Sequence, residues 1–389
     1  MAGVGLSRLL LIGGGHSHLF VLEALATGRI QAAETVLVSP DARQLYSGML
    51  PGYLGGRHTL DQLTFDLAAL AAAVGVRYLP GRVERIDAFG RTATLAGGTT
   101  LPYDVASVGI GGVPAGHALP GVAAHALPLK PADRALLIGP AFERAAAAAG
   151  PEPLQVAVVG AGAAGVELAL AARARLDQLE ASRAVITIYE SSHTILRDHG
   201  TTVAERAEAV LRSRDITLRL STRVEEVGPN HVVASGGRVA PADLILWATG
   251  TEAPPLFRAS GLPTDSRGFL SVDDALTVPG CPGLFGAGDA VTLLSAPRLP
   301  HAGVHAVRQG PVLARNLAAA LAGTGAYRNF RPRTESLALL NTADGRALGS
   351  WRGLALHSGT VLAVKDRIDR RFMRRFQRLA RGTAQGPRP

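Results

Sequence analysis

Two short apolar runs in this chain are each followed by a glycine-rich turn and an apolar, helix-like segment. Residues 9–12 read Leu-Leu-Leu-Ile and lead into Gly-Gly-Gly-His-Ser-His at residues 13–18. Residues 156–159 read Val-Ala-Val-Val and lead into Gly-Ala-Gly-Ala-Ala-Gly at residues 160–165. A buried strand that turns through glycines into a helix is typical of a dinucleotide-binding βαβ unit. The pattern therefore predicts two such units.

Each helix-like segment is followed by a second apolar strand pattern, at residues 35–38 and 185–189, as a βαβ unit requires. Glycine is needed in these turns because the backbone N–H groups must approach a phosphate at the positive end of the helix. A third element, Gly-Ala-Gly-Asp at residues 286–289, follows both turns. Together the three elements indicate a flavoprotein that also binds a nicotinamide nucleotide.

The first unit departs from the usual pattern at two places. His18 replaces the third glycine, and Ser39 stands where a carboxylate normally binds the adenosine ribose, with Asp41 two residues on. His16 and His18 form a His-x-His pair that could hold a metal, but no carboxylate or cysteine cluster accompanies it, so we predict no metal. The alternatives are a hydrogen bond from His16 to a phosphate or to backbone, and packing of His18 against the crossover. Tyr46, in the Gly- and Pro-rich stretch 46–52, either flanks a flat cofactor ring or closes the core.

The second unit has the complete glycine pattern and a carboxylate at the end of its second strand. Glu190 lies 25 residues beyond Gly165, close to the spacing of a ribose-binding acid. Its carboxylate would repel a 2′-phosphate, so the site should prefer NADH to NADPH, unless Glu190 is only a solvated strand-end residue. Glu167 lies in the first turn of the helix, where a carboxylate is favoured by the helix dipole with or without a functional role.

Composition indicates a globular protein of two or three domains, with 47% apolar and 18% charged residues over 389 positions. No apolar run reaches the roughly 18 residues of a membrane span, and residues 9–12 are too short for a signal peptide, so we expect a cytoplasmic location. The net charge of +9 is concentrated in residues 361–389, which carry nine basic and two acidic residues and leave +2 for the rest. We therefore predict no specific nucleic-acid partner, and the sequence leaves the oligomeric state undefined.

The single cysteine, Cys281, excludes a redox-active cysteine pair within these residues and is more typical of a structural thiol than of a nucleophile.

The C-terminal region predicts a hairpin followed by a basic helix. Strand patterns at residues 336–340 and 346–351 flank a turn at residues 344–345. In the helix, Ile368, Phe372, Phe376 and Leu379 recur at helical spacing among arginines. Three interpretations stay open: the apolar stripe packs on the protein itself, residues 361–381 lie on an anionic membrane, or the helix binds RNA or a protein.

With these turns, the junctions at residues 103–111 and 243–250, and the Gly-Ala-Gly-Asp element, residues 8–320 resemble the two-dinucleotide-binding flavoproteins, the pyridine nucleotide–disulfide oxidoreductase superfamily. Several segments resemble one branch of it, the flavoprotein module found in front of selenide, water dikinase. They are residues 13–18, 46–52, 129–131, 303–310 and 365–370.

The resemblance implies an α/β fold with two Rossmann-like domains and a small C-terminal hairpin-plus-helix region. It implies an FAD-binding domain at residues 1–120 and 255–330, an NAD(H)-binding domain at 121–254 and a C-terminal region at 331–389. Asp289 would hold the ribitol of FAD, Val83 would lie by the adenine, and Glu167 would orient the nicotinamide carboxamide. With the reasoning above, the predicted FAD-binding set is Gly13, Gly15, His16, Ser39, Tyr46, Val83, Gly111, Asp289 and Gly303, and the NAD(H)-binding set is Gly160, Gly162, Gly165, Glu167, Glu190 and Gly250.

We predict an FAD-dependent NAD(P)H oxidoreductase, related to type II NADH dehydrogenases, that passes electrons to a small-molecule acceptor. A quinone is one candidate, although residues 303–308 lack the two glutamines that type II dehydrogenases usually carry there. Contact of residues 361–381 with the inner face of the cell membrane would suit such an acceptor. We name no catalytic residue, because the redox chemistry belongs to the cofactors; His301, His305 and Lys130 either assist protonation or have packing and surface roles. The alternative function is a redox-responsive NADH- and FAD-binding protein, similar to apoptosis-inducing factor, whose basic tail binds a partner.

Overall fold

One half of the molecule is built on a parallel sheet in the order β21-β9-β1-β2-β5. The computed structural model describes residues 7–148, 150–181, 183–333, 337–351 and 354–381. At the centre of the sheet, residues 9–12 of β1 are at most 2% exposed because strands cover both edges and helices pack on its faces. The strands are β1 (Arg8–Ile12), β2 (Glu34–Ser39), β5 (Arg77–Pro80), β9 (Val105–Val108) and β21 (Leu284–Gly286).

Helices α1 (His16–Ala26) and α11 (Gly303–Leu321) pack against each other beside this sheet. Gly310 lies at their crossing, where a Cβ atom would be 2.3 Å from Cδ2 of Phe20. The remaining elements of this half are β3 (Arg43–Leu45), η1 (Ser47–Met49), α2 (Leu50–Leu54), α3 (Leu60–Leu63), β4 (Thr64–Asp66), α4 (Leu67–Ala73), β6 (Val83–Asp87), β7 (Thr92–Leu95), β8 (Thr100–Pro102), α10 (Leu256–Ala259), β20 (Leu270–Val272) and β22 (Val291–Leu293).

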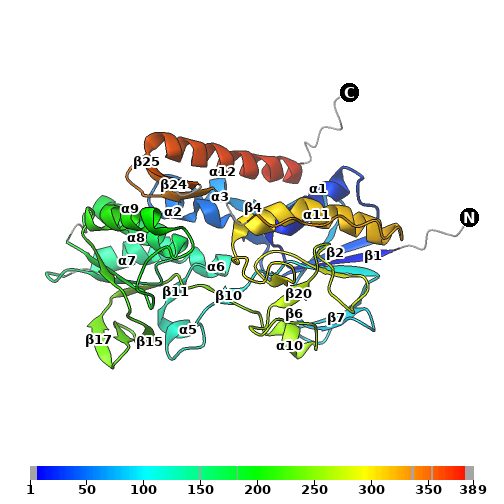
Figure 1. The fold of residues 1–389 in the computed structure, drawn as a ribbon, viewed down its shortest axis with the longest axis horizontal. Helices are drawn as coiled ribbons and strands as arrows, with labels where there is room; N and C mark the ends of the chain where they lie inside the picture. Colours follow the sequence, from blue (N-terminus) through cyan, green and yellow to red (C-terminus); the bar gives the residue numbers. More distant parts are fainter. Residues whose placement is uncertain (1–6, 149, 182, 334–336, 352–353, 382–389) are drawn as a thin grey trace, which may run out of the picture.

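The other half repeats this arrangement with a second parallel sheet, in the order β11-β18-β12-β13-β14. The two sheets lie at opposite ends of the elongated molecule, and β10 pairs with β19 between them (Figure 1). This half contains β10 (Val113–Pro114), α5 (Val122–His125), β11 (Leu127–Pro128), α6 (Ala132–Ala135), α7 (Ile138–Ala148), β12 (Gln155–Val159), α8 (Ala163–Gln178), β13 (Val185–Tyr189), α9 (Thr201–Arg212), β14 (Ile216–Arg219), β15 (Val224–Val227), β16 (His231–Ala234), β17 (Arg238–Pro241), β18 (Leu244–Trp247) and β19 (Thr251–Glu252).

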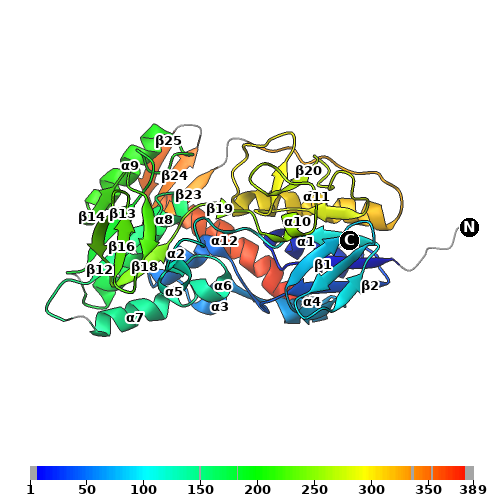
Figure 2. The same cartoon turned by 90° about the horizontal axis from the view of Figure 1, so that it is seen from below.

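The C-terminal region forms an antiparallel sheet and a long helix that crosses both halves (Figure 2). Strands β23 (Ala338–Asn341) and β24 (Ala347–Trp351) form the predicted hairpin, although Ser336 lies outside the described residues. A third strand, β25 (Leu354–Ser358), was not predicted. Helix α12 (Gly359–Ala380) begins directly after it, with Ser358 Oγ accepting from the Val361 N–H at the N-cap.

The predicted apolar stripe of the last helix is only partly correct. Phe376 and Leu379 are buried against the rest of the protein, and Phe372 is half-buried, so the helix packs on its own chain. Ile368, in contrast, is 47% exposed. The buried face passes instead through Lys365, Asp366 and Asp369, and hydropathy alone does not predict burial of such residues, because charged side chains are rarely buried without partners.

The structure confirms the α/β fold with two Rossmann-like units and a C-terminal hairpin and helix, while the exact domain limits stay a prediction. Among the helices within the described ranges, none combines the length and the hydropathy needed to cross a bilayer.

Candidate functional site

The first glycine turn brings the backbone of β1 and α1 against the end of β9. Gly13 adopts φ +94°, and its N–H donates to Val38 O at 2.7 Å. The Gly15 N–H donates to Gly109 O at 2.9 Å, and a Cβ atom on Gly15 would lie 2.4 Å from that oxygen. Side chains at these positions would force the strands apart, so the turn requires glycine.

His18, in place of the third glycine, packs the crossover, as one of the two sequence alternatives proposed. Its Nδ1 lies 2.6 Å from Gly13 O and its Nε2 lies 2.9 Å from Ser107 Oγ. Burial lowers its pKa to about 4, which keeps the ring neutral. Gly109 makes room, because a Cβ atom there would be 2.9 Å from His18 Cε1. The sequence reasoning missed Ser107, since a serine inside a buried strand shows its partner only in three dimensions.

His16 and Tyr46 lie together under α12. The His16 ring packs edge-on against Tyr46 at 5.5 Å between centroids, and Tyr46 stacks on Phe372 at 4.7 Å. Burial lowers the His16 pKa to about 4, and its Nε2 is buried with no hydrogen-bond partner. Because His16 and His18 contact different neighbours, they do not converge on one point. In the part of the chain that the structure describes, no three His, Cys, Asp or Glu residues are grouped as a metal site would need.

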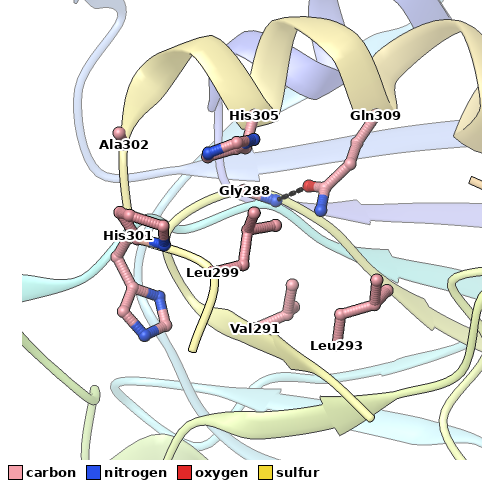
Figure 3. A pocket seen from close by; sticks show the side chains of 9 residues that line it. Gly288, Val291, Leu293, Leu299, His301, Ala302, His305 and Gln309 are labelled. Atoms are coloured by element: carbon pink, nitrogen blue, oxygen red, sulfur yellow. Dashed lines mark hydrogen bonds between the residues drawn. The ribbon is translucent and has the colours of Figure 1, made fainter. Parts of the chain in front are cut away.

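Asp289 is the buried carboxylate of this site. One of its oxygens, Oδ2, accepts from Lys130 Nζ at 2.5 Å, while Oδ1 is buried without a partner. Beside it, Gln309 Oε1 accepts from the Gly288 N–H at 2.7 Å and holds the Gly-Ala-Gly-Asp loop against α11. A small cavity lies at this point, and His301, His305 and Gln309 are among its lining residues (Figure 3). Burial lowers the pKa of both histidines, and His305 Nδ1 has no partner.

The other members of the predicted FAD-binding set line the same edge of the sheet or its margins. Ser39 ends β2 and its hydroxyl donates to Asp41 O at 3.2 Å. Val83 opens β6 shortly after Gly81, whose N–H donates to Ser39 O at 3.1 Å. Gly111 follows β9, and Gly303 opens α11.

The second glycine turn repeats the geometry of the first. The Gly160 N–H donates to Tyr189 O at 2.8 Å, and a Cβ atom on Gly165 would lie 1.9 Å from Gly160 O. Gly162 is the N-cap residue of α8. Gly250 lies shortly after the end of β18, the strand that pairs with β12. Glu190 lies across this turn, because its carboxylate accepts from the N–H groups of Ala161 at 2.8 Å and Ser192 at 2.7 Å.

Glu167 is half-buried and contacts the C-terminal sheet, and it lies just after the first turn of α8 and not within it as predicted. Its carboxylate accepts from the Asn341 N–H at 2.7 Å. Burial raises its pKa to about 7, although the positive charge of Lys365 and the Asn341 hydrogen bond oppose the shift. Glu167 therefore takes up a proton near neutral pH.

A buried polar network on α12 joins the two turns, and the sequence reasoning missed its role. Lys365 donates to Asp369 Oδ2 at 3.0 Å and to Gly48 O at 2.7 Å, and the Tyr46 hydroxyl donates to Asp369 Oδ1 at 3.1 Å. Burial alone would lower the Lys365 pKa, but Glu167 and Asp369 raise it. Beside this group, Arg57 donates to Asp366. The available signal was the Lys-Asp-x-x-Asp-Arg spacing, which places three charges on one helix face.

Cys281 is a buried free thiol at the start of a turn before β21. Burial raises its pKa, so the reactive thiolate is disfavoured at neutral pH. This agrees with a structural role.

Three of the buried atoms without partners match the chemistry of FAD. Asp289 Oδ1 can accept from a hydroxyl, and His16 Nε2 and His305 Nδ1 can donate to or accept from the polar groups of a phosphate or a ring, depending on tautomer. Such atoms cost free energy unless a ligand satisfies them. Their position beside the first glycine turn and α11 therefore fits a polar dinucleotide there.

Residues 7–310 match the model of the family described as pyridine nucleotide-disulphide oxidoreductase, so the chain belongs to this family. It is similar to demethylphylloquinone reductase NdbB from Synechocystis, with 27% identity over 373 residues that cover 92% of this chain and 90% of the relative. Among solved structures, it is similar in fold to the sulfide:quinone oxidoreductase of Aquifex aeolicus, with a TM-score of 0.80, 15% identity and coverage of 96% and 92% of the two chains. It is also similar in fold to NDH2 of Plasmodium falciparum in complex with NADH, with a TM-score of 0.78, 14% identity and coverage of 96% and 97%.

The chain is therefore an FAD-dependent NAD(P)H oxidoreductase with FAD and NAD(H) as its cofactors, as the sequence predicted. The narrower resemblance to the module found with selenide, water dikinase stays a prediction.

Proposed function

We propose that this protein is an NADH:quinone oxidoreductase in which FAD binds at the first glycine turn and NAD(H) at the second. In this proposal residues 1–120 and 255–330 form the FAD-binding domain, residues 121–254 form the NAD(H)-binding domain, and residues 331–389 are the C-terminal region with the hairpin and the basic helix. Bound at the first turn, FAD would supply the redox chemistry between the nicotinamide nucleotide and the acceptor.

The observation that carries the proposal is the arrangement of unsatisfied buried groups around the first turn. Asp289 Oδ1 and His16 Nε2 have no partner in the described chain, and both lie where a ribitol or phosphate group would supply one. The network from Glu167 through Lys365 and Asp369 to Tyr46 connects this place with the second turn. This connection supports two nucleotide sites that lie close enough for direct hydride transfer.

The residues of the chain have binding and orienting roles. Glu190 would accept from the ribose hydroxyls of NADH and disfavour a 2′-phosphate. Glu167, in the second turn of α8, would hold the nicotinamide end, and Tyr46 with Phe372 would shield one side of the flavin from water. With a single cysteine among 389 residues, no cysteine pair of this chain takes part in the electron transfer.

A quinone acceptor is supported by the relatives rather than by the glutamine pattern. The similar Synechocystis protein is named a demethylphylloquinone reductase, and it covers nearly the whole of this chain. The first turn of α11 has Val304 and Arg308 at the positions of the two glutamines. If a quinone binds here, it is therefore held by other contacts, and the aromatic surface of Tyr46 and Phe372 is the apolar candidate.

The C-terminal region has an exposed apolar surface that would suit contact with a membrane. Leu354 and Leu356 project from the same side of β25, and Trp351 is paired with Leu354 across the sheet. On α12, Val364 and Ile368 lie one turn apart and are 44% and 47% exposed. Exposed arginines, including Arg367, Arg371 and Arg374, follow along the same helix. Apolar side chains beside cations are typical of surfaces that bind anionic lipid.

The acceptor is tested by reducing the FAD-loaded protein with NADH under anaerobic conditions and then mixing it with a water-soluble quinone, with oxygen or with a one-electron dye. We expect the quinone to reoxidise the flavin fastest and to sustain turnover. A reduced NADH complex that persists in the presence of quinone would contradict the proposal and favour a redox-responsive binding protein.

Membrane contact is tested by a double substitution, Val364→Glu with Ile368→Glu, in sedimentation with vesicles that contain phosphatidylglycerol. We expect at least tenfold weaker binding than for the unchanged protein. The control is Val239→Glu, which alters a more exposed valine, 67% exposed, on β17 in the other half of the molecule. Equal binding by the double variant and the control would remove the membrane from the proposal. Deleting the helix would be a poor test, because it would uncover the apolar side chains on which Phe376 packs, such as Phe20 and Phe65.

A further inference from the structure

Lysine is rare in this chain, and both lysines occupy buried or half-buried positions in the proposed redox site. Of its 40 basic residues only Lys130 and Lys365 are lysine, and the others are arginine. Each ammonium group contacts an aspartate, Lys130 with Asp289 at 2.5 Å and Lys365 with Asp369 at 3.0 Å. Arginine fills every other Lys or Arg position, so these two places are the exceptions that call for an explanation.

The chemistry at Asp289 explains why a lysine suits position 130. An ammonium group is a compact charge, whereas a guanidinium is a fork that binds both oxygens of a carboxylate. Lys130 contacts only Oδ2, and Oδ1 stays buried without a partner. The ammonium group therefore hydrogen-bonds one oxygen of the carboxylate, and the other oxygen stays available to accept from a ligand hydroxyl.

Lys130 also supplies a positive charge beside Asp289, whereas the nearby histidines are uncharged. Burial keeps His16, His301 and His305 in the neutral form at neutral pH. The Asp289 carboxylate is only 9% exposed, so its ion pair with Lys130 lies at the edge of a region of low dielectric. In such a place a full charge acts more strongly on a bound cofactor than it would in water.

We propose that Lys130 is a positioning residue that keeps Asp289 Oδ1 free for a hydroxyl of FAD and whose charge favours the reduced cofactor. This inference rests on the proposed function, because it needs FAD beside Asp289. Hydride transfer brings two electrons and one proton to the flavin, which gains one negative charge while NADH becomes NAD⁺. A cation held by the protein near that charge stabilises the reduced state and raises the reduction potential.

The charge is tested with Lys130→Gln, which can still donate a hydrogen bond to Asp289 Oδ2 but carries no charge. The reduction potential of the FAD-loaded variant is measured against a reference dye. We expect the FAD content of the unchanged protein and a shift of at least tenfold toward oxidised flavin, which is about 30 mV for a two-electron couple. The control is Arg206→Gln, which removes an exposed charge on α9.

The role of the free oxygen is tested with Lys130→Arg. Because the charge is kept, the ratio of oxidised to reduced flavin in this variant should stay within threefold of that in the unchanged protein. The variant should bind FAD at least tenfold more weakly, because the guanidinium competes for Oδ1. An unchanged reduction potential in Lys130→Gln would overturn the inference. It would also be overturned if Lys130→Gln failed to fold or to hold FAD while Lys130→Arg folded and bound FAD like the unchanged protein. Unchanged FAD affinity in Lys130→Arg would overturn the account of Oδ1. A wild-type protein that binds no FAD would instead contradict the proposed function itself.

Discussion

Replacing Glu167 with glutamine should make the protein more stable at neutral and alkaline pH while leaving its stability in acid almost unchanged. The substitution keeps the size of the side chain and an oxygen that can accept from the Asn341 N–H. It removes only the ability to ionise. Any change that depends on pH therefore reports the charge of this one carboxylate.

The magnitude follows from the raised pKa. A glutamate at its usual 4.5 in the unfolded chain and at about 7 in the folded protein binds its proton more tightly when folded. Both states are protonated below about pH 4.5, so the group costs nothing there. Between about pH 4.5 and pH 7 the carboxyl group ionises more readily in the unfolded chain, which lowers the free energy of unfolding. Above about pH 7 this loss of stability levels off at about 3 kcal/mol. Glutamine avoids this loss, so the stability gap between variant and wild type should widen from about pH 5 to pH 8.

The assay is denaturant unfolding of the FAD-loaded protein at several pH values, followed by circular dichroism. Glu205→Gln is the matched control, because Glu205 is an exposed glutamate on α9. The difference in the free energy of unfolding between Glu167→Gln and wild type should widen from about pH 5 to pH 8. If it stayed constant or narrowed with rising pH, the pKa of Glu167 would not be raised in the folded protein.

Three other substitutions test the two glycine turns and the network between them. Glu190→Ala should weaken NADH binding and narrow the preference for NADH over NADPH, and an unchanged ratio of the two kcat/KM values would refute the ribose contact. Gly165→Ala places a Cβ atom against Gly160 O at 1.9 Å and should abolish NAD(H) binding, measured by fluorescence quenching, while FAD stays bound; normal NADH affinity would show that the turn can open freely. Tyr46→Phe removes the donor to the buried Asp369 and should cost about 1–3 kcal/mol of stability; an unfolding midpoint equal to that of wild type would mean that water replaces the hydroxyl.

The parts of the fold that the sequence predicted are those with a local cause. The runs at residues 9–12 and 156–159 became buried parallel strands because apolar runs before glycine turns have few other stable arrangements. Glu190 was predicted to lie beside the second turn, and it does, because the end of a strand next to the turn is fixed by the βαβ geometry.

The parts that the sequence did not predict depend on contacts between distant segments. The role of Asp369 became clear only when α12 was seen to bring it to Tyr46, 323 positions earlier in the chain. The same helix turns Ile368 outward, because its buried face contains the Lys365–Asp369 ion pair as well as apolar residues such as Phe376. Strand β25 was missed because its leucines alternate without a buried face of their own. The spacing of residues 365–370 places these charges on one helix face, but it does not identify the distant residues that they contact.

The most direct test of the central claim is an anaerobic titration of the FAD-loaded protein with NADH, followed by the absorbance of the flavin. If FAD and NAD(H) occupy adjacent sites as proposed, one equivalent of NADH per FAD should bleach the flavin band and produce one equivalent of NAD⁺. A protein that retains its FAD but keeps an unchanged spectrum in excess NADH would contradict the account.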